Sequence, residues 1–238
     1  MDVIEAYHLD PPTPEQAERA IAAWKTGRLA STLKRETKLW RTLRAPDATV
    51  AAAYSAVCFP SSTLCRFTPL MADGAIVPIA YAATTRDISL WETILRDIAH
   101  RAVKQIPDSE TVGRFTVRVE TTRTLKLIDL RRPKRYNLNV DAARAPDVSS
   151  AWEFYYPITR QWAQLLHDVI PEANGIRYES HQRQGDCILV WGHFTGDLFR
   201  ATGGAIAVSK SPVRRQLIKL AGDVGVGIDF AGDVEPPE

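Results

Sequence analysis

The 238-residue sequence is poor in cysteine and has no long apolar run. Its three cysteines, Cys58, Cys65 and Cys187, are an odd number without a close pair, which argues against a disulfide framework. No segment approaches the roughly 20 apolar residues that a membrane-spanning helix needs. The acidic start of the chain, residues 1–5, lacks the basic-then-apolar order of a signal peptide. We therefore expect a cytoplasmic protein that does not enter a membrane.

The sequence also has almost no net charge, because 30 basic side chains face 28 acidic ones. A charge of +2 gives no global reason to expect nucleic acid or membrane as a partner. The composition, 45% hydrophobic and 24% charged, excludes a wholly disordered, collagen-like or coiled-coil chain. Charge is uneven locally: residues 114–144 hold nine basic and three acidic side chains, whereas residues 222–238 hold five acids and no Lys or Arg.

The common metal and nucleotide motifs are missing. The five histidines form no HExxH pattern and do not join a Cys-x-x-Cys pair, so we expect no metal site. Gly222, Gly225 and Gly227 do not lie between a strand and a helix of a βαβ unit, so they do not predict a dinucleotide loop. The basic run 131–135 has no interleaved aromatic residues, which argues against direct binding of single-stranded nucleic acid.

Periodicity predicts a mixture of helices and strands. Thr13, Pro14 and Gln16 form a helix start with a capping box. Further helices are predicted from 47 to 57, over 87–103 and over 159–169, and strands over 64–68, 76–82, 115–119, 125–130, 175–180 and 187–191. Because consecutive strands dominate the second half, the pattern predicts an α+β domain.

Four polar residues lie in apolar settings. Arg66 interrupts a predicted strand, and Tyr81 and Ser180 each end one. Glu92 lies beside the apolar stripe of a predicted helix. Each has an ordinary structural explanation, such as a pairing of Glu92 with Arg96 one helical turn further on.

The order and spacing of these residues resemble the RES domain, a family known mostly as the toxin of bacterial RES–Xre toxin–antitoxin pairs. The matching motifs, in chain order, are Leu39-Trp40-Arg41, Arg66-Phe67, Tyr81-Ala82, Glu92 on a helix, Ile128-Asp129-Leu130, the Gly-Ile-x-Tyr-x-Ser strand at 175–180 and the aliphatic strand at 188–190. The resemblance covers residues 38–195. Cys65 and Thr68 depart from the usual Gly and Asn of the family, and His181 replaces a small residue or Arg.

The resemblance implies an α+β fold similar to that of ADP-ribosyltransferases, with central mixed or antiparallel sheets flanked by helices. It divides the chain into an N-terminal arm and helix (1–37), a catalytic core (38–200) and a C-terminal extension with an acidic tail, packed on the core (201–238). It implies an NAD-degrading toxin that cleaves the nicotinamide–ribose bond by phosphorolysis or hydrolysis. NAD is then the substrate, and inorganic phosphate is a candidate acceptor of the ADP-ribosyl group. The implied partner is an Xre-like antitoxin, in a complex that could contain a homodimer of the toxin.

The resemblance also assigns roles to individual residues. Glu92 would hold the ribose hydroxyls and stabilise the positive charge that develops at the anomeric carbon. Arg66, or as second choice Arg41, would grip the diphosphate in a bidentate manner. Tyr81 would hold the nicotinamide ring. The catalytic residues are thus Glu92, Arg66 and Tyr81, and the substrate-binding residues are Arg41, Ser180 and Phe67.

Three alternatives stay open at this point. A protein ADP-ribosyltransferase would keep the fold and change the acceptor. A non-catalytic binding protein would use the basic segment 114–144, with salt-dependent affinity for nucleic acid. A structural α+β domain would leave every polar residue packed or solvated.

Overall fold

The computed structural model describes residues 10–60, 65–96, 98, 104–138, 156–180, 183–192 and 198–230. In chain order, the strands of its large sheet are β1 (Ala30–Leu33), β2 (Lys38–Arg44), β3 (Phe59–Pro60), β6 (Pro78–Ala83), β8 (Arg114–Thr121), β9 (Leu125–Asp129), β10 (Gly175–Glu179), β11 (Asp186–Trp191), β12 (Phe199–Ala201) and β13 (Ile206–Ala207). Two small sheets pair β4 (Met71–Ala72) with β5 (Ala75–Ile76) and β7 (Gln105–Ile106) with β14 (Gly227–Ile228). The helices are α1 (Pro14–Lys25), α2 (Ala48–Ser55), α3 (Arg86–Leu90) with its π-helical continuation η2 (Trp91–Leu95), the 3₁₀ turns η4 (Asp108–Glu110) and η5 (Lys134–Leu138), α4 (Tyr156–Val169) and α5 (Val213–Gly222). None of the helices among these residues is long and apolar enough to cross a lipid bilayer.

The large sheet has the strand order β1-β9-β10-β11-β6-β2-β8-β12, with β3 beside β6 and β13 beside β8. Only β9 and β10 run parallel among its paired strands in the described chain. The strands β2 and β6 share a single residue pair, Trp40 with Ala83, whereas β2 and β8 are paired along all of Lys38–Arg44. The sheet is therefore two halves joined at a narrow point. This architecture confirms the predicted α+β class with a mixed sheet flanked by helices.

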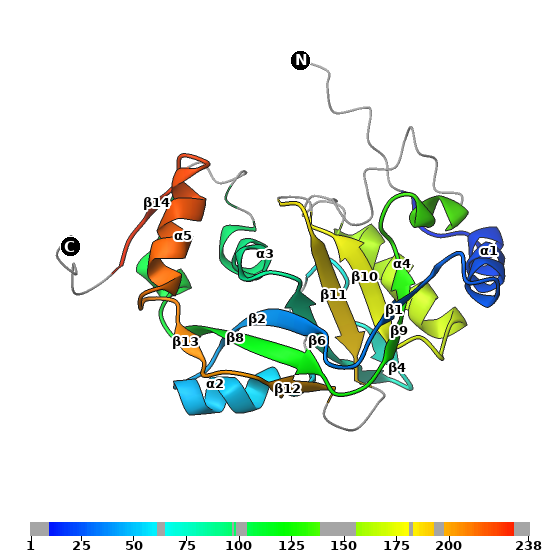
Figure 1. Ribbon diagram of the computed structural model, residues 1–238. Coiled ribbons are helices and arrows are strands. Elements are labelled where there is room, and N and C mark those ends of the chain that lie inside the picture. The colour runs from blue at the N-terminus through cyan, green and yellow to red at the C-terminus, as the bar shows by residue number, and fades with distance from the viewer. Residues whose placement is uncertain are drawn as a thin grey trace, which may run out of the picture.

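Helices cover both faces of the sheet (Figure 1). The helices α1 and α4 bury Trp24 and Trp162 against the half that contains β9, β10 and β11. On the other half, α2 packs through Ala51 onto one face of β2 and β8, and α3 lies on the opposite face, where α5 packs against it. Because side chains alternate along a strand, successive residues of β2 point toward α2 and toward α3 in turn.

Three helix starts are fixed by local side chains. Thr13 and Gln16 form the predicted capping box of α1. Asp47 caps α2 by accepting a hydrogen bond from the backbone of Val50. Thr85 caps α3 in the same way, with Ile88 as the donor. The helix that carries Glu92 therefore begins at a defined residue.

Two predicted elements differ from the structure. The predicted strand 64–68 is wrong over the residues described: Cys65 and Thr68 form only an isolated bridge, and Arg66 lies in the turn between them. Pro69 follows at once and has no N–H with which to extend a ladder. The predicted helix 87–103 begins as an α-helix but is a π-helix over Trp91–Leu95, and residues 97 and 99–103 lie outside the described chain.

The C-terminal helix α5 lies against the helix that carries Glu92. Leu217 of α5 is buried in one apolar cluster with Trp91 and Leu95 of η2. Polar contacts hold the same interface, since the guanidinium of Arg86 donates to the side chain of Gln216. Residues 213–222 therefore brace the helix that presents Glu92.

The buried carboxylate of Asp129, at the end of β9, is linked through Arg131 to Asp186, at the start of β11. Asp129, which is 0% exposed, accepts two hydrogen bonds from the guanidinium of Arg131 at 2.9 and 2.8 Å and one from its backbone N–H at 3.1 Å. It also faces the ammonium group of Lys134 at 3.6 Å. Arg131 also donates to Asp186 at 2.9 Å. Burial opposes the charge of Asp129, but the bonds and charge of Arg131, with Lys134, outweigh it and lower the pKa of this carboxyl.

We expect Asp129→Asn to lower the free energy of unfolding at pH 7 by about 3 kcal/mol, because it breaks a buried ion pair. Since the pKa is lowered in the folded state, this stabilisation is complete above the unfolded pKa of about 3.9 and is lost as the pH falls through the folded value. Urea unfolding at pH 7 and at pH 3 measures both effects. Glu15→Gln, in a largely exposed pair with Arg19, is the control, and an equal effect of both variants would refute the buried role.

Candidate functional site

A cavity of about 300 Å³ opens at the narrow join of the two half-sheets. It lies between β6, the turn at residues 65–68 and the α3–η2 helix. Its lining residues are Thr42, Cys65, Arg66, Tyr81, Ala82, Ala83, Ser89, Glu92, Thr93, Arg96, Arg114, Tyr178 and Cys187. The volume falls at the lower end of the range for small-molecule sites.

Glu92 enters the cavity from the π-helical turn of η2. The hydroxyl of Ser180 donates a hydrogen bond of 2.8 Å to its Oε1 atom. Ser180 follows β10 directly and is itself anchored, because its backbone N–H donates to the carbonyl of Gly185 at 2.9 Å. Within the described chain, Oε2 of Glu92 accepts no hydrogen bond, so this oxygen is available to a ligand. Short π-helical turns of this kind recur at functional sites.

Arg66 lies across the cavity in the turn between Cys65 and Thr68 and is only 8% exposed. Its guanidinium lies over the ring of Tyr178, 5.5 Å from the centroid, and the hydroxyl of Thr159 on α4 donates to its carbonyl. Burial lowers the pKa of Arg66, but the negative charge of Glu92 contributes most to raising it, and the pKa ends above its ordinary value. Arg66 is therefore a permanent cation beside the carboxylate.

Two tyrosines form an aromatic wall of the cavity. Tyr81 comes from β6 and Tyr178 from β10. Burial raises the pKa of both phenols above the usual value, so both are neutral at pH 7. The two rings offer a planar ligand an apolar surface with hydroxyl groups.

Phe67 does not line the cavity. It is fully buried in the core below the site and packs edge-to-face on Tyr178, with ring centroids 5.1 Å apart. Its structural role is therefore to support the ring of Tyr178 rather than to contact a ligand directly. Of the residues expected at the site, Phe67 is thus not brought to the cavity that Glu92, Arg66 and Tyr81 line.

Arg41 also lies outside the cavity. It stands on β2 next to Thr42 but on the opposite face, where it donates to the carbonyls of Ser55 at 2.5 Å and Val57 at 3.0 Å. These carbonyls belong to the end of α2, so the guanidinium caps that helix. Burial lowers the pKa of Arg41 to about 10. Arg41, expected as the second choice for the diphosphate, is thus not brought to the cavity that Arg66 lines.

The structure adds cavity residues that the sequence analysis did not select. Arg96 lies on the chain that follows η2, where it contacts Cys65 and the ring of Tyr156. Arg114 begins β8. The hydroxyl oxygens of Thr42 and Ser89, which both line the cavity, lie 2.7 Å apart. The motif that contains Tyr178 could have identified that residue, but no local signal marks Arg114.

The chemistry of the lining suits an anionic, ring-containing ligand. Three guanidinium groups outnumber the single carboxylate of Glu92 among the lining side chains. A carboxylate held by a hydroxyl can stabilise a developing positive charge, and arginines bind phosphate oxygens. No group of three His, Cys, Asp or Glu side chains suited to a metal ion occurs in the part of the chain that the structure describes.

The basic run 131–135 has structural partners. Arg131 binds two aspartates, and Lys134 donates to the carbonyl of Ala30. Arg135 is 5% exposed. These contacts take up much of the charge that a nucleic-acid surface would need.

Comparison with known proteins identifies a shared fold. No known family profile and no curated protein matches the chain. Among solved structures, a chain of the MbcT–MbcA toxin–antitoxin complex of M. tuberculosis aligns with a TM-score of 0.56 and 11% sequence identity. The alignment covers 88% of this chain and 98% of that chain. This chain therefore shares its α+β fold with a component of a toxin–antitoxin complex.

Proposed function

We propose that this protein is an NAD-cleaving toxin, neutralised by an Xre-like antitoxin. The proposal rests on the resemblance of its motifs to the RES domain, on the shared fold and on the composition of the cavity. The observation that carries it is the hydrogen bond from Ser180 to Glu92, which lines the cavity together with Arg66 and Tyr81. These four residues come from distant parts of the sequence and meet at one site.

The reaction needs few groups. Breakage of the nicotinamide–ribose bond leaves an electron-poor anomeric carbon, similar to the transition state of glycoside hydrolysis. Glu92 would stabilise that charge with one oxygen and keep its orientation through Ser180. Tyr81 would stack on the nicotinamide ring, and Arg66 would bind a phosphate oxygen of the substrate.

The acceptor completes the reaction. Attack by inorganic phosphate on the anomeric carbon gives nicotinamide and a phosphorylated ADP-ribose, whereas attack by water gives nicotinamide, ADP-ribose and a proton. Both products follow from the same bond cleavage. The proposal therefore makes nicotinamide the common product and leaves the second product to identify the acceptor.

The proposal of an antitoxin partner is based on the shared fold. A chain of similar fold occurs in a toxin–antitoxin complex, and an uninhibited NAD-cleaving enzyme would deplete its own cell. We propose that the antitoxin covers the cavity that contains Glu92. Addition of such a partner should then abolish turnover without unfolding the toxin.

Nicotinamide release from NAD tests the proposal. We expect the purified protein to release nicotinamide, with a rate that rises with phosphate concentration if phosphate is the acceptor. Mass spectrometry of the second product separates phosphorolysis from hydrolysis. Absence of release with phosphate, with water and with lysate proteins as acceptors would contradict the proposal, whereas labelling of lysate proteins alone would favour a protein ADP-ribosyltransferase.

A further inference from the structure

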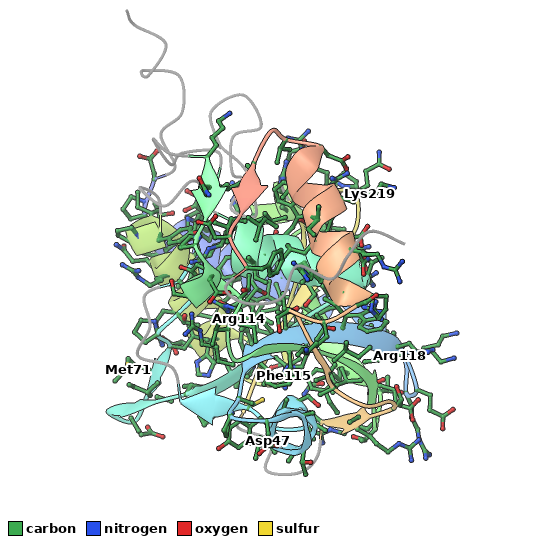
Figure 2. The ribbon with its side chains drawn as sticks, turned by 90° about the vertical axis from the view of Figure 1, so that its left-hand side faces the viewer. Asp47, Met71, Arg114, Phe115, Arg118 and Lys219 are labelled. Atoms are coloured by element: carbon green, nitrogen blue, oxygen red, sulfur yellow. The ribbon has the colours of Figure 1, made fainter. Side chains whose placement is uncertain are left out.

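The proposed reaction leaves four polar residues of the cavity lining without a role. Arg96 and Arg114 line the cavity together with Thr42 and Ser89, and the proposed reaction gives a role to none of these four residues. Arg114 begins β8 on the face of the sheet that carries α3 and α5, and it is labelled in Figure 2. The side chain is 14% exposed.

Two contacts with Glu110 fix the orientation of the Arg114 guanidinium and involve only its Nε and Nη2 atoms. Its Nε atom donates to the carbonyl of Glu110 at 2.6 Å, and its Nη2 atom lies 3.0 Å from the Glu110 carboxylate. Within the described chain, the Nη1 atom makes no hydrogen bond, so two N–H groups are available to a ligand. A guanidinium fixed in this way is preorganised to bind an oxyanion.

A second cation lines the same cavity, since Arg96 is among the lining residues together with Arg114. Burial and the charge of Arg44 lower the pKa of Arg114 and the charge of Arg96 lowers it further, whereas the hydrogen bond and charge of Glu110 raise it. The Glu110 carboxylate offsets only one of these two positive charges, so an anion that reached both guanidinium groups would be attracted by the other.

The hydroxyl pair adds a neutral donor. Thr42 and Ser89 share one hydrogen bond of 2.7 Å. Because each hydroxyl carries one hydrogen and only one lies between them, the other hydrogen is available to a ligand oxygen in the described site. Two cations with a nearby hydroxyl donor match the tetrahedral oxygens of a phosphate group.

We propose that Arg114 and Arg96, with the hydroxyls of Thr42 and Ser89, form a phosphate-binding subsite in this cavity, in addition to Arg66. This subsite rests on the proposed function. Its ligand is either the diphosphate of the dinucleotide or the free phosphate that accepts the ADP-ribosyl group. Both sources present the same oxyanion chemistry.

Calorimetric titration with inorganic phosphate and with ADP, at constant ionic strength, tests the subsite without any turnover. Arg114→Ala and Arg96→Gln should each weaken binding of at least one of these probes by ten- to a hundredfold, since a charged hydrogen bond is lost. Arg114→Lys should recover part of the lost affinity, because lysine keeps the positive charge but lacks the planar, bidentate donor geometry of a guanidinium.

Arg118→Ala is the matched control. Arg118 lies four residues further along β8 on the same face, well separated from Arg114 in Figure 2, and it does not line the cavity. Equal binding by the Arg114→Ala and Arg118→Ala proteins, or no binding of either probe by the unaltered protein, would overturn the subsite. If Arg114→Ala does not fold, Arg96→Gln and Arg114→Lys decide the question by the same criterion.

Kinetics distinguish the two sources of phosphate. If the subsite holds the diphosphate, the Arg114→Ala variant has a raised KM for NAD. If the subsite holds the acceptor phosphate, the same variant has a raised KM for phosphate. Binding of ADP through Arg114 without any nicotinamide release would support the subsite and refute the proposed function. Nicotinamide release with unchanged KM values in Arg114→Ala would refute the subsite and leave the proposed function in place.

Discussion

Glu92→Gln is expected to reduce the rate of nicotinamide release by roughly 10²–10³-fold while leaving the melting temperature nearly unchanged. Glutamine keeps the size of the side chain and can still accept a hydrogen bond from Ser180. It has no negative charge, so it cannot stabilise the cation that develops at the anomeric carbon. The loss therefore falls on the transition state, and kcat should decrease far more than the affinity for NAD. Steady-state kinetics with the folded variant provide the measurement.

Glu179→Gln is the matched control for this experiment. Glu179 lies beside Ser180 at the end of β10 but does not line the cavity. The variant removes the same charge next to the residue that donates to Glu92, and we expect its rate to stay within about twofold of the unaltered protein. A Glu92→Gln protein that is as active as the Glu179→Gln protein would remove Glu92 from the reaction.

Arg66→Lys is expected to lower kcat/KM for NAD by roughly ten- to a hundredfold. Lysine retains the positive charge but cannot reproduce the planar, two-pronged contact with a phosphate, nor the stacking of a guanidinium on Tyr178. A fall in kcat/KM with a preserved thermal transition would assign Arg66 to the substrate.

Arg41→Lys separates this effect from the loss of any buried arginine. Both guanidinium groups are less than 10% exposed, but that of Arg41 binds the end of α2 outside the cavity. We expect Arg41→Lys to lower the melting temperature and to preserve kcat/KM. The reverse pattern, with activity sensitive to Arg41 and insensitive to Arg66, would contradict the site described above.

The sequence predicted those parts of the fold that depend on neighbouring residues. The start of α1 is marked by Thr13 and Gln16, whose hydrogen bonds span three residues and need no tertiary contact. Strand β8 was recognised from the alternation of apolar and polar side chains over residues 115–119, which one buried face requires. Such signals lie within a few residues of the element that they specify.

The errors lie where a distant contact decides the structure. Arg66 was placed on a strand, but Pro69 and the contact of its backbone with Thr159, 93 residues away, hold it in a turn. The π-helical turn around Glu92 was predicted as ordinary α-helix, because an apolar stripe spaced three and four apart does not reveal one widened turn.

The candidate site was predicted only in part for the same reason. Glu92 and Ser180 were selected because a polar residue in an apolar setting is visible in the sequence, and the structure brings them into contact. Arg41 lies away from the cavity, because alternation along β2 predicts that adjacent residues face opposite sides but not which side holds the cavity. Arg114 was missed because it reaches the cavity through the pairing of β8 with β2.

The crystal structure of the Glu92→Gln protein with NAD tests the central claim most directly. The account predicts that the nicotinamide ribose lies within hydrogen-bonding distance of residue 92, with the nicotinamide ring against Tyr81 and phosphate oxygens on Arg66 or Arg114. NAD bound elsewhere, or a cavity that stays empty at saturating NAD, would contradict the assignment of this cavity to NAD cleavage.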